Sequence, residues 1–298
     1  MNKFYYLTKR NTKLFFKDKG MFFCSLITPL ILLVLYAVFL GDVFKDTYIQ
    51  MIPEGVKVSE SILNGLAGGQ LMSSLLSVSC VTVAFCSNML MVQDKLNGAR
   101  KDFLMTKLKK STLSLSYYAS TLISTLIISV CATLVCFIYL ACVGWFLSVL
   151  DCLMIFVDVL LLSMFGTALS SIVNYFLSSQ GQVSAVGTIV SSMYGFISGA
   201  YMPISSFGAG LQKVLMFLPS TYGSSLMRRH CLRGALSKFQ STCNLPNATI
   251  IEIKKAIDYD LYFFGNKVSF GAMFGIVAGT ICLLIISYLV INKFCKKK

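Results

Sequence analysis

Few residues in this chain are of the types that perform catalysis, and their spacing does not assemble a reactive group. The chain has one histidine, His230, and Ser198 lies in a Gly-Phe-Ile-Ser-Gly segment that only loosely resembles the turn of a membrane serine hydrolase. The spacing of that segment is wrong and arginines precede His230, so a Ser–His pair is not expected. GxxxxGK[ST] and HExxH motifs are absent from the sequence. The sequence therefore predicts a protein that is not an enzyme and binds no cofactor or metal of its own.

Two further groups of residues raise chemical questions. Asp158 lies inside an apolar segment, where a carboxylate is costly and marks a functional site by default. It is near one end of that segment, on the same face as Asp151, so either it reaches toward water or it contacts a substrate. The eleven cysteines lack the spacing of metal-ligand pairs. Cys231 and Cys243 lie outside the apolar segments. The sequence does not decide whether these two cysteines form a disulfide.

The elements that must position these residues are membrane-spanning helices. Hydrophobic residues make up 56% of the 298 residues, only 13% are charged, and the mean hydropathy is +0.75. A soluble domain of this length cannot bury so much apolar surface, and the alternation of membrane strands is absent. We therefore predict an all-α integral membrane protein with one transmembrane domain, residues 1–298. Because a helical span needs about 20 mostly apolar residues, six spans are predicted, over residues 22–40, 67–91, 116–141, 152–177, 183–199 and 268–291.

The distribution of charge predicts the orientation of the chain. With the N-terminus inside, the inner segments contain 16 basic and 3 acidic residues, and the rest of the chain contains 10 basic and 9 acidic residues. Lys and Arg concentrate on the cytoplasmic side of membranes, so we expect a multi-pass protein of the cell membrane with both termini cytoplasmic. Basic residues spread along the rims of spans favour contact with anionic lipids and argue against nucleic acid as a partner.

Two segments outside the spans are expected to form further helices. Residues 1–21 place Phe4, Leu7, Leu14 and Phe15 near one helical face and lysines around much of the rest, a pattern typical of an interfacial helix. Residues 200–267 form the external segment. Pro203 and Pro219 bracket an amphipathic stretch there that is too short to cross, which predicts short re-entrant or surface helices between the fifth and sixth spans.

Residues 92–115 form a basic loop between the second and third spans, which is expected to be cytoplasmic. In this loop VQDKLNGARKDFLMTKLKKSTL resembles the first cytoplasmic loop of ABC type 2 exporter permeases. The residues that match or lie within the motif are Asp94, Lys95, Gly98, Arg100, Lys101, Asp102, Phe103 and Leu104, while Lys107 stands where that family usually has proline. The N-terminal stretch with Pro29 inside its span and the segment GAYMPISSFGAGLQKVLMFLPSTYG are also similar to that family.

The resemblance implies a transport mechanism shared between subunits. In that family two permeases, identical or homologous, pair and recruit cytoplasmic ABC ATPase subunits, which bind ATP and Mg²⁺. The loop would act as a coupling segment, with Asp94, Lys95 and Asp102 contacting the ATPase and Phe103 and Leu104 filling an apolar groove. The pathway would follow the second and fifth spans, for which we name the polar residues Ser73, Ser77, Asn88, Ser191 and Ser198. The alternative function is a stand-alone six-span channel or carrier, and the transported substrate is not indicated by the sequence.

Overall fold

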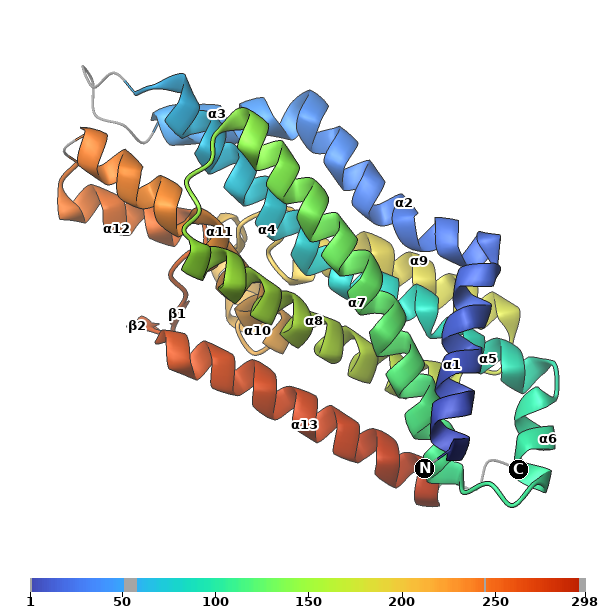
Figure 1. The fold of residues 1–298 in the computed structure, drawn as a ribbon. Coiled ribbons are helices and arrows are strands. Elements are labelled where there is room, and N and C mark those ends of the chain that lie inside the picture. The colour runs from blue at the N-terminus through green and yellow to red at the C-terminus, as the bar shows by residue number, and fades with distance from the viewer. Residues whose placement is uncertain (1, 51–57, 244, 295–298) are drawn as a thin grey trace.

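The computed structural model describes residues 2–50, 58–243 and 245–294, and these are almost entirely helical (Figure 1). The first half of the chain forms α1 (Asn2–Lys17), α2 (Lys19–Leu35), a π-helical segment (Tyr36–Leu40), α3 (Gly41–Gln50), α4 (Glu60–Ser87), α5 (Met89–Leu96), α6 (Ala99–Met105) and α7 (Lys110–Val143). The second half forms α8 (Val149–Phe176), α9 (Gln180–Ile197), a 3-10 turn (Ile204–Ser206), α10 (Ala209–Leu215), α11 (Pro219–Cys243), α12 (Asn247–Ala256), β1 (Tyr262–Phe263), β2 (Asn266–Lys267) and α13 (Phe270–Phe294). The prediction of an all-α membrane protein is confirmed, with one short antiparallel hairpin added.

The long helices follow the apolar runs of the sequence. Five helical stretches within the described ranges are long and apolar enough to cross a bilayer, namely Lys19–Gln50, Glu60–Leu96, Lys110–Val143, Val149–Phe176 and Phe270–Phe294. Each corresponds to one predicted span. The sixth predicted span, 183–199, falls on α9, a helix of 18 residues that is rich in Gly and Ser and is not among these five stretches. The count of six spans therefore stays a prediction that depends on α9.

Helix α4 lies at the centre of the bundle, where α2, α7, α8, α9 and α11 all pack against it (Figure 1). Nearly every side chain along α4 is buried. Glycines allow the neighbouring helices to approach closely. A Cβ atom added at Gly69 would lie 2.8 Å from the backbone oxygen of Cys231, and one added at Gly166 would lie 2.8 Å from the Cα of Val81. The packing of α4 on α8 and α11 therefore requires glycine at these two positions.

The N-terminal helix differs from our expectation in two ways. It ends at Lys17 instead of residue 21, because the Asp18 side chain accepts a hydrogen bond from the backbone N–H of Met21 and caps the start of α2. In addition, α1 packs along α7. Phe15, which we expected to lie in lipid, is buried in an apolar cluster with Met21 and Ile128. The apolar face of α1 is therefore directed partly at the protein.

Helix α11 is the main element that the sequence did not predict. Its 25 residues pack against α4, α8 and α13, although the sequence is polar. Short helices were expected between the fifth and sixth spans, and α10 and α12 match that expectation. However, the polar stretch that begins at Pro219 shows no apolar periodicity, and its buried face contains Ser225, Arg228 and His230. Such a face is stable only because distant parts of the chain supply hydrogen-bond partners.

The beginning of α1, the short helix α6 and the end of α13 lie at the same end of the bundle (Figure 1). Lys3 on α1 donates a hydrogen bond to the backbone oxygen of Lys107, 3.1 Å away. Ser114 near the start of α7 donates to the side-chain oxygen of Asn292 near the end of α13, 2.7 Å away. These contacts place the described ends of the chain and the basic segment on one side of the bundle.

Candidate functional site

The basic segment between α4 and α7 forms two short helices connected by a tight turn. Helix α5 continues from α4 after a break at Asn88, and α6 follows at a sharp angle (Figure 1). The turn requires Gly98, whose φ of 82° lies in the left-handed region that other residues rarely adopt. The segment expected as a loop is therefore largely helical, and Gly98 sets the direction of α6.

Asp94 lies inside this end of the bundle and not on its surface. It is 5% exposed. Both terminal guanidinium nitrogens of Arg10 donate to its carboxylate, over 2.7 and 3.1 Å, and the Tyr117 hydroxyl donates over 2.7 Å. The hydrogen bond to Asp94 raises the pKa of the Arg10 guanidinium. In this structure the Asp94 carboxylate accepts hydrogen bonds within the chain and connects α5 to α1 and α7. Its predicted contact with an ATPase stays a prediction.

Lys95 and Arg100 are also directed at their own chain. The Lys95 ammonium group donates to the backbone oxygens of Tyr175 and Leu177, 3.2 and 2.5 Å away. These carbonyl groups lie at the C-terminal end of α8, where a cation is favourable. The Arg100 guanidinium lies over the ring of Tyr175, 5.4 Å from its centroid. Lys95 and Arg100 thus hold α5 and α6 against α8, and the contact of Lys95 with an ATPase stays a prediction.

Helix α6 presents one face to the protein and another to solvent. Phe103 and Leu104 are half-buried and pack against an apolar cluster that includes Tyr117. The exposed side consists of Lys101, Asp102 and Met105, and the Met105 side chain is 86% exposed. The apolar residue most accessible to a partner on α6 is therefore Met105, which the sequence motif did not single out. Its position as the last residue of α6 becomes evident only from the helix boundaries.

A family model for ABC-2 type transporters matches residues 2–230, a range that includes α1, the basic segment between α4 and α7, and the first half of α11. The chain belongs to the ABC-2 type transporter family. No curated protein matches the chain significantly. Family membership identifies the chain as the permease subunit of an ABC transporter, which is not itself an ATPase. It also favours this function over the stand-alone channel or carrier.

The pathway residues predicted on the second span are all buried within the permease. Ser73 and Ser77 donate to backbone oxygens of their own helix, 2.8 and 2.7 Å away. Asn88 donates from its amide nitrogen to Ser170 and Ser171 on α8, each 3.1 Å away. Thr121 on α7 donates to its amide oxygen. In this conformation, Ser73 and Ser77 bond within α4, and Asn88 fixes the junction of α4 and α5 to α7 and α8.

The predicted residues on the fifth span lie in two different surroundings. Ser198 is 1% exposed, at the C-terminal end of α9, whereas Ser191 is half-buried. A further stripe of hydroxyl groups on α9, at Ser184, Thr188 and Ser192, is exposed. Thr188 and Ser192 donate to backbone oxygens one turn earlier. The polar face of α9 is therefore uncovered in the single permease chain.

Asp158 pairs with the one histidine of the chain, a contact that sequence reasoning missed. The His230 Nδ1 and a carboxylate oxygen of Asp158 are 2.5 Å apart. Asp158 is 1% exposed, and the His230 ring packs edge-on against Phe270. The pair connects α8 to α11, so Asp158 neither reaches water nor lines an open path in this conformation. The signal in the sequence was the coincidence of one intramembrane carboxylate and one histidine in the same chain.

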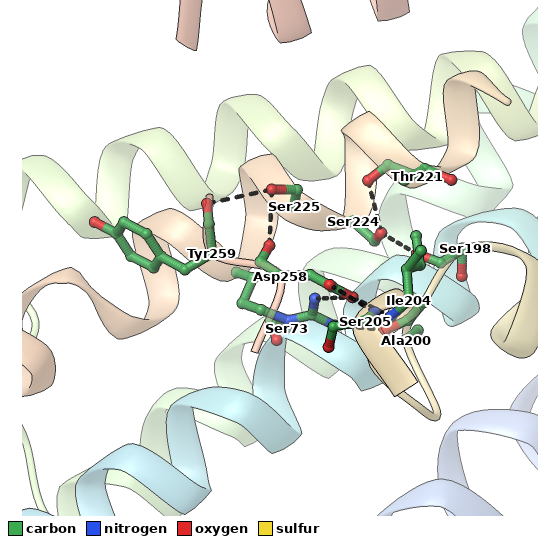
Figure 2. A network of polar contacts seen from close by, with 12 residues as sticks. Ser73, Ser198, Ala200, Ile204, Ser205, Thr221, Ser224, Ser225, Asp258 and Tyr259 are labelled. Atoms are coloured by element: carbon green, nitrogen blue, oxygen red, sulfur yellow. Dashed lines mark hydrogen bonds and ion pairs between the residues drawn. The ribbon is translucent and has the colours of Figure 1, made fainter. Parts of the chain in front are cut away.

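A buried ionic network fixes the segment after α9 to α11 (Figure 2). Arg228 on α11 is 1% exposed, and it donates to the backbone oxygen of Gly199 over 2.6 Å. It lies 3.5 Å from the carboxylate of Asp258. Asp258 in turn accepts from the backbone N–H groups of Ile204 and Ser205, over 2.5 and 3.4 Å. Burial raises the pKa of Asp258, while Arg228 and these N–H groups act in the opposite direction. The network determines where the chain turns after α9.

Cys231 and Cys243, for which the sequence left a disulfide undecided, do not form one. Cys231 and Cys243 are both buried and free. They lie twelve positions apart on the single helix α11, which corresponds to about 18 Å along the axis. A disulfide requires Cα atoms within about 7 Å, so these two residues cannot bridge each other.

Proposed function

We propose that this permease is the membrane subunit of an ATP-driven exporter, which moves its substrate out of the cytoplasm and is coupled to a separate ABC ATPase through α6. The observation that carries the proposal is the position of α6. It projects from the end of the bundle beside the start of α1, and it is held in place by internal contacts of Asp94, Lys95 and Arg100. A surface helix that is fixed so firmly from behind can transmit a push from a partner into the bundle.

The ATPase partner would bind ATP and Mg²⁺, and its contact with the permease would be centred on Met105. Lys101, Asp102 and Met105 face solvent on α6, which gives an apolar anchor surrounded by charges. Interface energy is usually concentrated in a few such anchors. Phe103 and Leu104 support α6 from the protein side, so their expected contribution is to position the helix rather than to fill a groove of the ATPase.

The coupling proposal predicts that Met105→Glu weakens binding of the ATPase without affecting insertion. Loss of an anchoring side chain at an interface costs about 2 kcal/mol or more, so copurification of the partner ABC ATPase should fall at least tenfold. ATPase activity stimulated by the permease should fall with it. The purified permease alone is expected to hydrolyse no ATP.

The matched control for this experiment is Met202→Glu, which makes the same substitution at an exposed methionine after α9. It should leave ATPase binding at the parental level. Parental binding by Met105→Glu, or an equal loss in both variants, would show that α6 is not the docking element.

A second permease is expected to cover the polar stripe of α9. Ser184, Thr188 and Ser192 would otherwise face lipid, whereas hydroxyl groups on membrane helices are favoured at contacts between helices. Either a second copy of this chain or a homologous permease would serve, and the substrate pathway would then lie between the two subunits. Ser191 is the predicted pathway residue closest in sequence to this stripe. Switching between inward and outward openings requires that ATP-bound partners bind the two states unequally.

The proposed orientation places α6 and both ends of the chain in the cytoplasm, with residues 200–267 outside. We expect that a cysteine at Lys238, an exposed position on α11, reacts with a membrane-impermeant thiol reagent on intact cells. A cysteine at Lys101, exposed on α6, should react only after permeabilisation. Both Lys→Cys substitutions would be made in a cysteine-free background. Labelling of position 101 alone on intact cells would show that the chain has the opposite orientation.

A further inference from the structure

An apolar groove runs along the bundle between α2 and α7. It has a volume of about 470 Å³. One wall is formed by α2, with Leu26, Pro29 and Leu30 among its residues, and the opposite wall by α7, including Cys131 and Val135. Both helices pack against or beside α4, which closes the groove from behind at Leu75. The groove is therefore enclosed on three sides and is lined almost entirely by apolar groups.

The groove has a closed end and a length that matches one half of a bilayer. At the α1 end it is bounded by Phe16 of α1 and Phe22 of α2, on either side of the bend at Asp18. From Phe22 to Leu33 its α2 wall is twelve residues long, or about 16 Å of helix. The hydrocarbon core of a bilayer is about 30 Å thick, so one leaflet is about 15 Å deep. The dimensions fit a single acyl chain that extends from the level of α1 toward the middle of the membrane.

Two exposed lysines lie one helical turn from the aromatic residues that bound this end of the groove. Lys13 precedes Phe16 by three residues on α1, and Lys19 precedes Phe22 by three residues on α2, so each lysine lies on about the same side of its helix as the aromatic residue. Both are exposed. Within the described ranges, neither ammonium group takes part in an ion pair or hydrogen bond. The nearby carboxylate of Asp18 accepts from the backbone of Met21 to cap α2.

We propose that this groove is a binding site for one anionic glycerophospholipid from the leaflet in which α1 lies. One acyl chain occupies the groove between α2 and α7, and the phosphate group is held by Lys13 and Lys19. The apolar walls select an alkyl chain, while the two cations select a negative head group over a zwitterionic one. The site is distinct from α6 and from the polar face of α9, and it does not depend on coupling to an ATPase.

Occupation by lipid would connect α1 to both walls of the groove. Helix α1 packs on α7 and continues into α2 through the bend at Asp18. A head group on Lys13 and Lys19 contacts both sides of this bend, and the acyl chain fills the space between α2 and α7. The bound lipid therefore acts as a packing element at a place where those two helices do not meet closely.

The test uses the full-length permease in vesicles that contain a photoactivatable phosphatidylglycerol with a diazirine on one acyl chain. Phosphatidylcholine with the same chain is the comparison probe. Cross-linked peptides would be quantified by mass spectrometry, with labelling of the α2 wall as the readout. We expect the anionic probe to label this wall at least about fivefold more than the zwitterionic one. Equal labelling by the two probes would overturn the proposal.

Two variants separate the contributions of head group and chain. Lys13→Gln with Lys19→Gln should reduce labelling by phosphatidylglycerol to the level of phosphatidylcholine. Cys131→Trp places a large ring on the α7 wall and should lower labelling of the α2 wall by both probes. Cys131 is exposed toward the groove, so this substitution does not require the core to repack.

The matched controls change the same properties elsewhere. Lys109→Gln with Lys110→Gln removes two exposed charges at the start of α7, and Leu283→Trp adds a ring on α13, which does not line the groove, at a side chain that is 63% exposed. Both controls should leave labelling unchanged. A loss with the Lys109 and Lys110 pair equal to that with the Lys13 and Lys19 pair would mean that only bulk charge matters. Cross-linking of the groove residues to a second permease chain would assign the groove to a subunit interface instead. Either result would overturn the proposal.

Discussion

Replacement of Asp258 by alanine is expected to lower the free energy of unfolding by about 3–5 kcal/mol, because it leaves the buried charge of Arg228 without its partner. The two side chains are 1% and 6% exposed, so water cannot replace the lost carboxylate. The substitution also removes the acceptor for the backbone N–H groups of Ile204 and Ser205. Thermal unfolding in detergent should show an apparent Tm lower by roughly 10 °C.

Asp260→Ala provides a comparison within the same segment. Asp260 is also buried, but its partners Arg229 and Lys267 are 17% and 50% exposed, so they can regain contact with water. The expected loss is therefore clearly smaller than that of Asp258→Ala. Adding Arg228→Met to Asp258→Ala should restore part of the stability, because it removes the unpaired charge. Equal and small effects of Asp258→Ala and Asp260→Ala would contradict the importance of the Arg228 pair.

Asp94→Ala is expected to loosen α5 and α6 from the bundle while the permease still inserts in the membrane. The change removes the carboxylate that accepts from Arg10 and Tyr117. Because the Arg10 side chain is 33% exposed, solvent compensates part of the loss, and we expect a cost of about 1–3 kcal/mol. Hydrogen exchange of the α5 amide groups should become at least about tenfold faster. Stimulation of the partner ATPase by the permease should fall in parallel.

The control for this substitution is Asp102→Ala, which removes an exposed carboxylate from α6. It should leave hydrogen exchange in α5 unchanged, although it can weaken docking of the ATPase. Arg10→Met should reproduce the effect of Asp94→Ala, and the double variant should be less destabilised than the sum of the two single variants. Unchanged exchange in Asp94→Ala would exclude a structural role for the pair.

The sequence predicts those parts of the fold that are determined by contact with lipid. The long apolar runs predict the spans, since a segment in the membrane must satisfy its own backbone hydrogen bonds and therefore forms a helix. Local signals also indicated shorter features, such as the amphipathic stretch between Pro203 and Pro219, which contains α10. Hydropathy alone does not decide whether α9 spans the membrane, because its Gly and Ser residues make the helix less hydrophobic.

The sequence did not predict the parts that depend on pairing between distant residues. Arg228 and Asp258 are thirty positions apart, and Asp158 and His230 are seventy-two apart, so neither pair leaves a local pattern. The coupling motif had a similar weakness. Its charged residues suggested contact with a partner, but a motif cannot distinguish Asp94, which faces Arg10 on another helix, from Asp102, which faces solvent. Only the packing of α1 against α5 and α7 makes that distinction.

The long helix formed by α4 and α5 is interrupted at Asn88, near one end of the permease. The Asn88 amide is fastened to α7 and α8, whereas Asp94, about 9 Å farther along α5, is fastened to α1. If α6 receives force from an ATPase, as we propose, we expect that force to reach α1 through Asp94. Since α1 leads directly into α2, the peripheral helices would then move first relative to the buried helix α4.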